Sequence, residues 1–176
     1  MVENGGASFG IGHLYLEMTV VDDSTVQIIE IKPLFFNATP LLPSWAYTPQ
    51  GGCGDSYSRT FGLDLDRQTL VDMGLPSDAP DAVPSTARSE PLGPSFHVSR
   101  DEPAEIRLDV FSCNASYYEW GVRIKYVAEG RTFTKDIGSS ATPFRSIGSG
   151  DKRVPAYTRS TATELAAFQP IKSFCT

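Results

Sequence analysis

Apolar and polar residues alternate along much of this chain, and this alternation limits the possible folds more than any other feature. The clearest run is residues 117–127, where Tyr118, Trp120, Val122 and Ile124 occupy every second position, with polar residues or glycine between them. Side chains of an extended strand point alternately to its two faces, so this run predicts a strand with one buried face and one solvated face. A chain built mainly from such runs must cover the apolar face of each of its sheets.

Seven segments carry enough of this pattern to predict strands. They are residues 13–21, 25–36, 58–66, 95–100, 104–113, 117–127 and 130–137. The sequence Asp-Asp-Ser between the first two segments favours a turn, so we expect these two to form a β-hairpin. Half-polar strands are typical of antiparallel sheets, and two such sheets can cover each other. The sequence therefore predicts an all-β, immunoglobulin-like antiparallel β-sandwich of about seven to eight strands, with a closed barrel as the alternative.

The predicted strands end before residue 150, and a chain of 176 residues is long enough for one sizeable core. We therefore expect a single sandwich domain over residues 1–150 and a tail over residues 151–176. Two long segments interrupt the strands, a Pro/Gly-rich loop at 40–52 and a proline-rich stretch at 71–95. The 71–95 stretch is too long for an ordinary hairpin loop, so it is either a functional surface loop or mobile. Both segments are candidate contact regions.

The tail contains one pattern that is typical of a helix start. Thr161 is followed three residues later by Glu164, which matches a capping box, and Pro170 would stop the segment that follows. The sequence therefore predicts one short C-terminal helix near residues 162–169.

Composition excludes some classes of partner. The chain has 15 basic and 21 acidic residues, a net charge of −6, and no cluster of Lys and Arg, so nucleic-acid binding is not expected. No run approaches the roughly 18 apolar residues of a membrane span, so a membrane would be reached only through a segment absent from this chain. The opening, MVENGGASFG, lacks the basic and then apolar pattern of a signal peptide. Either the protein is cytoplasmic, or the chain is a segment of a longer protein.

Residues that could carry catalysis are few. The only histidines, His13 and His97, are expected on solvated strand faces, and neither a G-x-S-x-G motif nor a glycine-rich loop for nucleotides is present. Asp64 and Asp66 should share one strand face about 7 Å apart. Such a pair could bind calcium or act as acid and base in a hydrolase, although acidic residues on a solvated sheet are common. We therefore expect no enzyme and no cofactor, and we keep a carbohydrate-active hydrolase using Asp64 and Asp66 as the alternative.

Aromatic residues divide into a predicted core and a predicted surface. Tyr118 and Trp120 share a strand face with aliphatic residues, and with Phe144 they are assigned to the structural core. Trp45 and Tyr47 lie in the Pro/Gly-rich loop and are expected to be exposed. They form the candidate contact loop for a protein partner or a cell-wall component.

Three cysteines occur, Cys53, Cys113 and Cys175, and no C-x-x-C pair or nearby histidine indicates zinc. Cys53 precedes one predicted strand and Cys113 ends another. If two of the three are bridged, we expect this pair, with Cys175 free. Closing a loop of about 60 residues would stabilise the fold by roughly 4 kcal/mol. Three reduced thiols, two of them buried as small apolar side chains, are the alternative.

Three stretches, 53–66, 96–126 and 130–148, resemble an uncharacterised family of actinobacterial, mainly Streptomyces-type, proteins. The family pattern is a Cys-Gly before a strand ending in Leu-Asp, a V-S-x-x-[DE]-P-E stretch, a Cys before a Trp-centred strand, and a closing Pro-Phe-Arg. The matching residues are Cys53–Gly54, Leu65–Asp66, Val98–Ser99 with Asp101–Pro103, Cys113, Trp120 and Pro143–Phe144–Arg145. The chain departs from the pattern at Ala104, which stands where the family tends to place Glu.

The resemblance covers about half of the chain and implies an extracytoplasmic domain, often carried behind a transmembrane segment on a larger protein. It supports the Cys53–Cys113 bridge and implies no enzymatic activity. The leading hypothesis is a non-catalytic extracytoplasmic binding domain, such as the outer domain of a membrane-anchored sensor or regulator. The alternatives are the hydrolase and a cytosolic structural subunit of an assembly, and the oligomeric state stays open.

Overall fold

A computed structural model of the chain describes residues 6–48, 59–74, 92, 96–161 and 164–173. Within these ranges every regular element is a β-strand and no helix occurs, so the all-β prediction is confirmed. The strands are β1 Ser8–Phe9, β2 Ile11–Met18, β3 Val26–Pro40, β4 Ala46–Tyr47, β5 Arg59–Asp64, β6 Thr69–Gly74, β7 His97–Val98, β8 Ala104–Phe111, β9 Ser116–Ala128, β10 Arg131–Ile137, β11 Phe144–Ile147, β12 Val154–Arg159 and β13 Leu165–Ile171.

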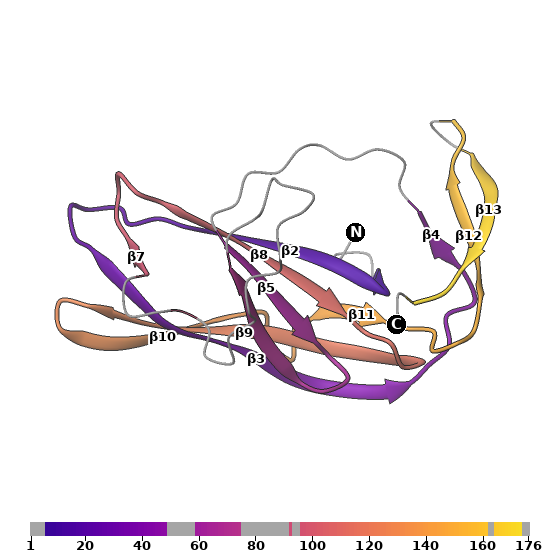
Figure 1. Ribbon diagram of the computed structural model, residues 1–176, viewed down its shortest axis with the longest axis horizontal. Helices are drawn as coiled ribbons and strands as arrows, with labels where there is room; N and C mark the ends of the chain where they lie inside the picture. Colours follow the sequence, from indigo (N-terminus) through magenta and orange to yellow (C-terminus); the bar gives the residue numbers. More distant parts are fainter. Residues whose placement is uncertain (1–5, 49–58, 75–91, 93–95, 162–163, 174–176) are drawn as a thin grey trace.

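The described strands form three sheets (Figure 1). The largest has the order β1-β11-β9-β3-β7, with β10 also paired to β9. A four-stranded sheet has the order β2-β8-β5-β6, and a three-stranded sheet has the order β13-β12-β4. Parallel pairs occur in each sheet, namely β1 with β11, β5 with β8, and β12 with β4. The sheets are therefore mixed, whereas the sequence predicted antiparallel ones.

One hydrophobic core is shared by the two larger sheets. In β8, alternate side chains from Ala104 to Val110 are at most 4 % exposed, and in β9 those from Tyr118 to Ile124 are at most 5 % exposed. Residues of both strands belong to the same buried cluster. The alternation seen in the sequence thus corresponds to inward faces that pack on each other, as elementary strand geometry requires.

The prediction that residues 13–36 form a β-hairpin is wrong. The turn itself forms, because Asp22 Oδ1 accepts the backbone N–H of Ser24 at 3.0 Å. The flanking strands nevertheless lie in different sheets, β2 against β8 and β3 against β9. Each strand has one apolar face, and the crossing lets both faces contribute to the shared core.

The sheets curl, and the architecture is a curled, half-barrel-like sheet arrangement and not clearly an immunoglobulin-like sandwich (Figure 1). The described residues contain 13 strands, where the sequence predicted about seven to eight for the chain. Two of the additional strands, β1 and β4, are only two residues long, which is too short to show alternation in the sequence.

The predicted C-terminal helix is also wrong, because residues Leu165–Ile171 form strand β13 and pair with β12. The bond expected for a capping box does occur: Thr161 Oγ1 accepts the N–H of Glu164 at 3.1 Å. In addition, the N–H of Ser160 donates to the carbonyl of Glu164 at 3.0 Å, which closes a turn between antiparallel strands. The same local pattern therefore serves a hairpin, and β12 joins this hairpin to β4 from an early part of the chain.

Candidate functional site

The three-stranded sheet lies at one end of the molecule and carries the aromatic residues of the predicted contact loop (Figure 1). Tyr157 of β12 stands opposite Tyr47 of β4 and Ala167 of β13, so these side chains share one face. Trp45 precedes β4, and its ring centroid lies 6.2 Å from that of Tyr157, with the ring planes at 77°. The opposite face of the sheet carries Ala156, which is buried.

Side chains on the first face remain accessible to solvent. Trp45 is 54 % exposed, Tyr157 36 % and Leu165 55 %, while Tyr47 is half-buried. Arg159, also exposed, pairs in register with Leu165. We call these five residues the aromatic face.

The sequence identified Trp45 and Tyr47 of this face but missed the other three. Their signal was present in residues 154–159, where Val154, Ala156 and Thr158 are buried and the residues between them are exposed. The low apolar content of the region and the apparent helix cap obscured this alternation.

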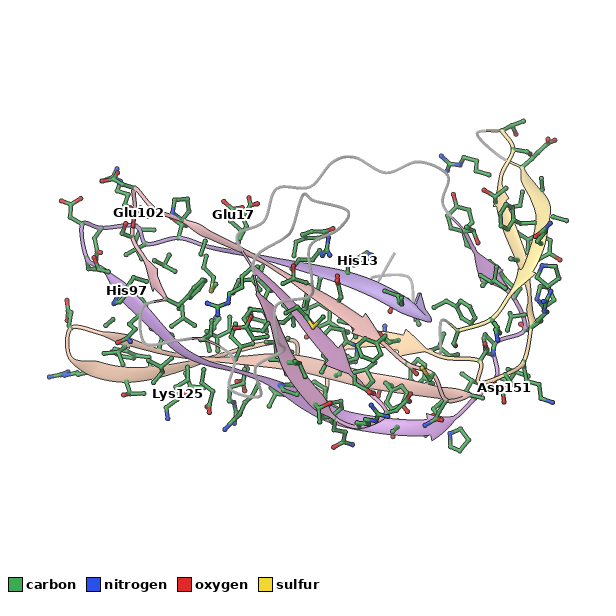
Figure 2. All side chains as sticks on the ribbon, viewed as in Figure 1. His13, Glu17, His97, Glu102, Lys125 and Asp151 are labelled. Atoms are coloured by element: carbon green, nitrogen blue, oxygen red, sulfur yellow. The ribbon has the colours of Figure 1, made fainter. Side chains whose placement is uncertain are left out.

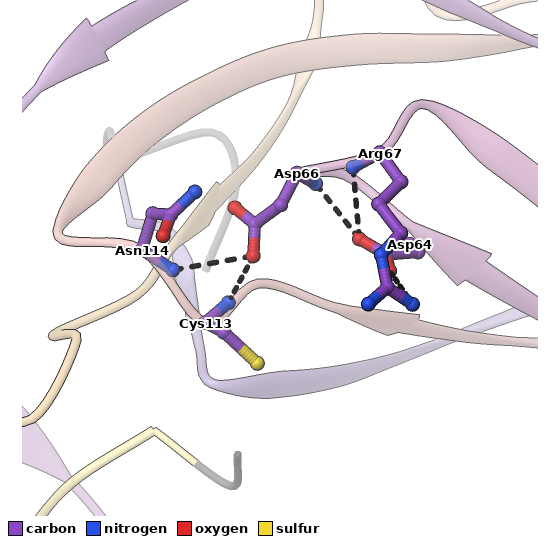
Figure 3. A network of polar contacts seen from close by, with 5 residues as sticks. All are labelled: Asp64, Asp66, Arg67, Cys113 and Asn114. Atoms are coloured by element: carbon purple, nitrogen blue, oxygen red, sulfur yellow. Dashed lines mark hydrogen bonds and ion pairs between the residues drawn. The ribbon is translucent and has the colours of Figure 1, made fainter. Parts of the chain in front are cut away.

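Asp64 ends β5 and holds the turn that follows it (Figure 3). Its Oδ1 accepts the backbone N–H groups of Asp66 and Arg67, both at 3.0 Å. The Arg67 guanidinium lies 3.8 Å from the other carboxylate oxygen. Gln68 in this turn has a positive φ of 56°, a conformation that a well-held turn can maintain. The carboxylate of Asp64 therefore has a structural role.

Asp66 connects this turn to the segment between β8 and β9 (Figure 3). Its Oδ2 accepts the backbone N–H of Cys113 at 2.6 Å and that of Asn114 at 3.2 Å. Its Oδ1 accepts the Tyr118 hydroxyl at 2.5 Å, with the Ser112 hydroxyl at 3.5 Å. Burial, and then the bond to Asp66, raise the pKa of Tyr118 above its ordinary value. Asp66 thus fixes one strand end against the entrance to β9.

The two aspartates point from one turn toward different partners. Both carboxylates accept backbone N–H groups, and neither faces the other across an open site. Among the described residues, no group of three or more His, Cys, Asp or Glu side chains is arranged to hold a metal ion.

The two histidines are exposed and lie on strands of different sheets (Figure 2). Nδ1 of His13 is 2.7 Å from Oδ1 of Asp109. Arg107 also contacts this carboxylate, with Nε and Oδ1 2.8 Å apart. These contacts link neighbouring strands β2 and β8 on the solvated side of their sheet.

Trp120 and Tyr118 lie in the core, at 3 % and 5 % exposure, and half-buried Phe144 packs against them. The ring centroids of Trp120 and Phe144 are 4.9 Å apart, and the indole N–H donates to Ser146 Oγ at 3.0 Å. Beside them is a cavity of about 250 Å³ with a largely apolar lining. It is lined by Gly6, Ala7, Ser8, Gly12, His13, Leu14, Val110, Trp120, Phe144 and Arg145.

Cys113 lies in the segment between β8 and β9 and is disulfide-bonded. Cys53 and Cys175 both fall outside the described residues. The Cys53–Cys113 pairing and a free Cys175 therefore stay predictions.

Comparison of the chain with protein-family models, with curated proteins and with solved structures finds no match in any of the three. The resemblance to an actinobacterial family thus stays an expectation from the sequence. In the described part of the chain, no helix is long and apolar enough to cross a membrane.

Proposed function

We propose that this chain is a non-catalytic binding domain that acts outside the cytoplasm and contacts a protein partner through the aromatic face. The observation that carries the proposal is the exposed pair of Trp45 and Tyr157, with Arg159 and Leu165 on the same side of the small sheet. Trp, Tyr and Arg are the residues most enriched where protein interfaces concentrate their binding energy. Covering large exposed rings with a partner removes apolar surface from water, which makes the free energy of binding more favourable.

The geometry of the pair favours a protein over a wall glycan. The ring planes of Trp45 and Tyr157 are inclined at 77°, so together they do not present one flat surface on which successive sugar rings could stack. The two rings pack edge to face, and their exposed surfaces can contact apolar side chains of a partner, while the guanidinium of Arg159 can donate hydrogen bonds to a carboxylate.

The location outside the cytoplasm is supported by the disulfide at Cys113, because disulfides persist in oxidising compartments and are rare in the cytosol. The actinobacterial resemblance supports the same location and suggests the outer domain of a membrane-anchored sensor or regulator. In this proposal the two larger sheets act as the layers of a sandwich and the small sheet presents the aromatic face.

The other two functions have less support. A hydrolase would require Asp64 and Asp66 to act on a substrate, whereas both accept backbone N–H groups that hold a turn and a strand end. A cytosolic structural subunit would contain three reduced thiols, which does not fit a bridged Cys113.

The proposal is tested by quantitative affinity capture from envelope extracts of the source cells, followed by titration with the purified partner. The W45A/Y157A variant should lose at least 90 % of the captured partner and bind the purified partner at least 50-fold more weakly. The control is Y15A, which removes a ring 45 % exposed on another sheet and should bind like the wild type. Equal capture by both variants would refute the assignment, and co-sedimentation with purified wall glycan that depends on Trp45 would transfer the site to a glycan.

A further inference from the structure

The cavity beside Trp120 is lined by strands of both larger sheets. β2 and β8 of the four-stranded sheet provide Leu14 and Val110, and β9 and β11 of the largest sheet provide Trp120 and Phe144. We propose that this cavity binds a neutral, apolar molecule of about two fused rings. The cavity is separate from the aromatic face, so the proposal goes beyond the proposed function and does not depend on it.

Strand β1 forms one wall of the cavity, and hydrogen bonds hold this wall in place. Ser8 pairs in register with Ser146 of β11, and their hydroxyl oxygens are 2.7 Å apart. Directly after β1, the N–H of Gly10 donates to the carbonyl of Ile147 at 2.9 Å, and its carbonyl accepts the N–H of Ser112 at 3.0 Å. The wall is therefore fixed before a ligand enters, and a preformed site lowers the cost of binding.

Small residues on this side explain why a hollow remains. Gly6 and Ala7 contribute little bulk to the lining. At Gly12 of β2, a Cβ would lie only 2.7 Å from the Cβ of Ser8, so glycine allows β1 to approach β2 this closely. With small residues on one side and rings on the other, a space of about 250 Å³ is left.

The rings of the lining offer apolar surface. The ring planes of Trp120 and Phe144 are inclined at 40°, with their centroids 4.9 Å apart. The indole N–H already donates to Ser146 Oγ at 3.0 Å, so Trp120 presents its ring and not a free donor. Leu14 and Val110 add aliphatic groups. Water in such a lining finds few hydrogen-bond partners, so an apolar ligand that displaces it is favoured.

The charged groups of the lining already have partners within the protein. Nε of Arg145 is 3.7 Å from Oε1 of Glu119. Nδ1 of His13 is 2.7 Å from Oδ1 of Asp109. A charged ligand would have to compete with these pairs and would also lose its hydration on entry. These contacts therefore favour a neutral ligand over an anionic one.

The volume of the cavity limits the size of the ligand. An engineered apolar cavity of about 150 Å³ accommodates benzene, and drug-sized ligands occupy pockets of about 300 to 1,000 Å³. At about 250 Å³, this cavity lies between the two. Two fused rings fit this range.

Indole is a suitable probe, because it is neutral, has two fused rings and dissolves well in water. It is titrated into the isotopically labelled full chain, and the backbone amides and tryptophan indole groups are followed by NMR. We expect saturable shifts at Gly12, Val110 and the Trp120 indole N–H, with a Kd of about 1 mM or lower. W45F assigns the Trp120 signal, because the chain has only two tryptophans.

Two variants and a second probe make the test specific. A7F places a ring in the cavity and should weaken indole binding at least tenfold. The control is V21F, which adds a ring at a side chain that is 90 % exposed and should bind like the wild type. Indole-2-carboxylate, the anionic counterpart of the probe, should bind the wild type at least tenfold more weakly than indole.

If A7F fails to fold, intermolecular NOEs in the wild-type protein decide. They should connect indole to the methyl groups of Leu14 and Val110. Several results would each overturn the proposal: no saturation, shifts or NOEs confined to other parts of the chain such as the aromatic face, equal binding by A7F and the wild type, or equal or tighter binding of the carboxylate.

Discussion

Replacing Asp66 with alanine should destabilise the fold far more than replacing its neighbour Asp64. The Asp66 carboxylate accepts the N–H of Cys113 at 2.6 Å and the hydroxyl of Tyr118 at 2.5 Å, and both donors belong to the β8–β9 region. Tyr118 is only 5 % exposed, so water cannot readily replace its lost partner. Hydrogen bonds to charged groups contribute about 1.5 to 3 kcal/mol each.

The two short bonds together predict a loss of about 3 to 6 kcal/mol for D66A. The third donor, the N–H of Asn114, is exposed, and water can satisfy it after the substitution, so it adds little. Domains of this size unfold with roughly 5 to 15 kcal/mol, so the variant should be close to its stability limit.

D64A is the matched control, because it also removes a carboxylate that accepts two backbone N–H groups. Those groups belong to a turn whose end is exposed, so the expected loss is about 1 kcal/mol. Urea unfolding of both variants, followed by fluorescence with the disulfide intact, gives the two free energies. A loss below about 1 kcal/mol for D66A, or equal losses in the two variants, would refute the structural role assigned to Asp66.

Three further predictions concern a titrating hydroxyl, a close backbone approach and a surface ion pair. Burial raises the pKa of Tyr118 in the folded state above its ordinary value of 10.0, so the contribution of its hydroxyl to stability is present below pH 10 and is lost as the pH rises through the raised pKa. In urea titrations above pH 10, Y118F should therefore lose less stability with rising pH than the wild type does. G148A should lower the yield of folded protein or the melting temperature by at least 10 °C, because a Cβ there would lie 2.8 Å from the carbonyl oxygen of Ser112. D136N should leave the urea midpoint unchanged within error, because the ion pair between Asp136 and Arg123 is exposed and screened by solvent.

The sequence predicted the strands well because alternation follows directly from backbone geometry. All seven segments expected as strands contain one, and the strand centred on Trp120 lies in the core. Alternation says which face of a strand is buried, but it does not say which strand lies beside it. The turn at Asp22 therefore suggested a hairpin, although pairing across the whole chain placed β2 and β3 in different sheets.

Local polar motifs were harder to interpret. The contact between Thr161 and Glu164 was expected from the sequence, but it closes a hairpin and does not begin a helix. Asp66 has the appearance of an ordinary surface acid in the sequence. Its role became visible only when folding brought Cys113 and Tyr118 to it from about 50 residues away.

The aromatic face was only half visible in the sequence for a related reason. Trp45 and Tyr47 stood out as large rings in a loop rich in proline and glycine. Tyr157 is more than 100 residues away, and only the pairing of β4 with β12 brings it to the same face.

The most direct test of the proposed binding role is site-specific photo-crosslinking in living source cells. A photoreactive phenylalanine analogue is placed at Trp45, and in a separate control strain at Tyr15. The proposal predicts one protein adduct, identified by mass spectrometry, that forms from position 45 and not from position 15. No adduct at position 45, or the same adducts from both positions, would contradict a specific contact through the aromatic face.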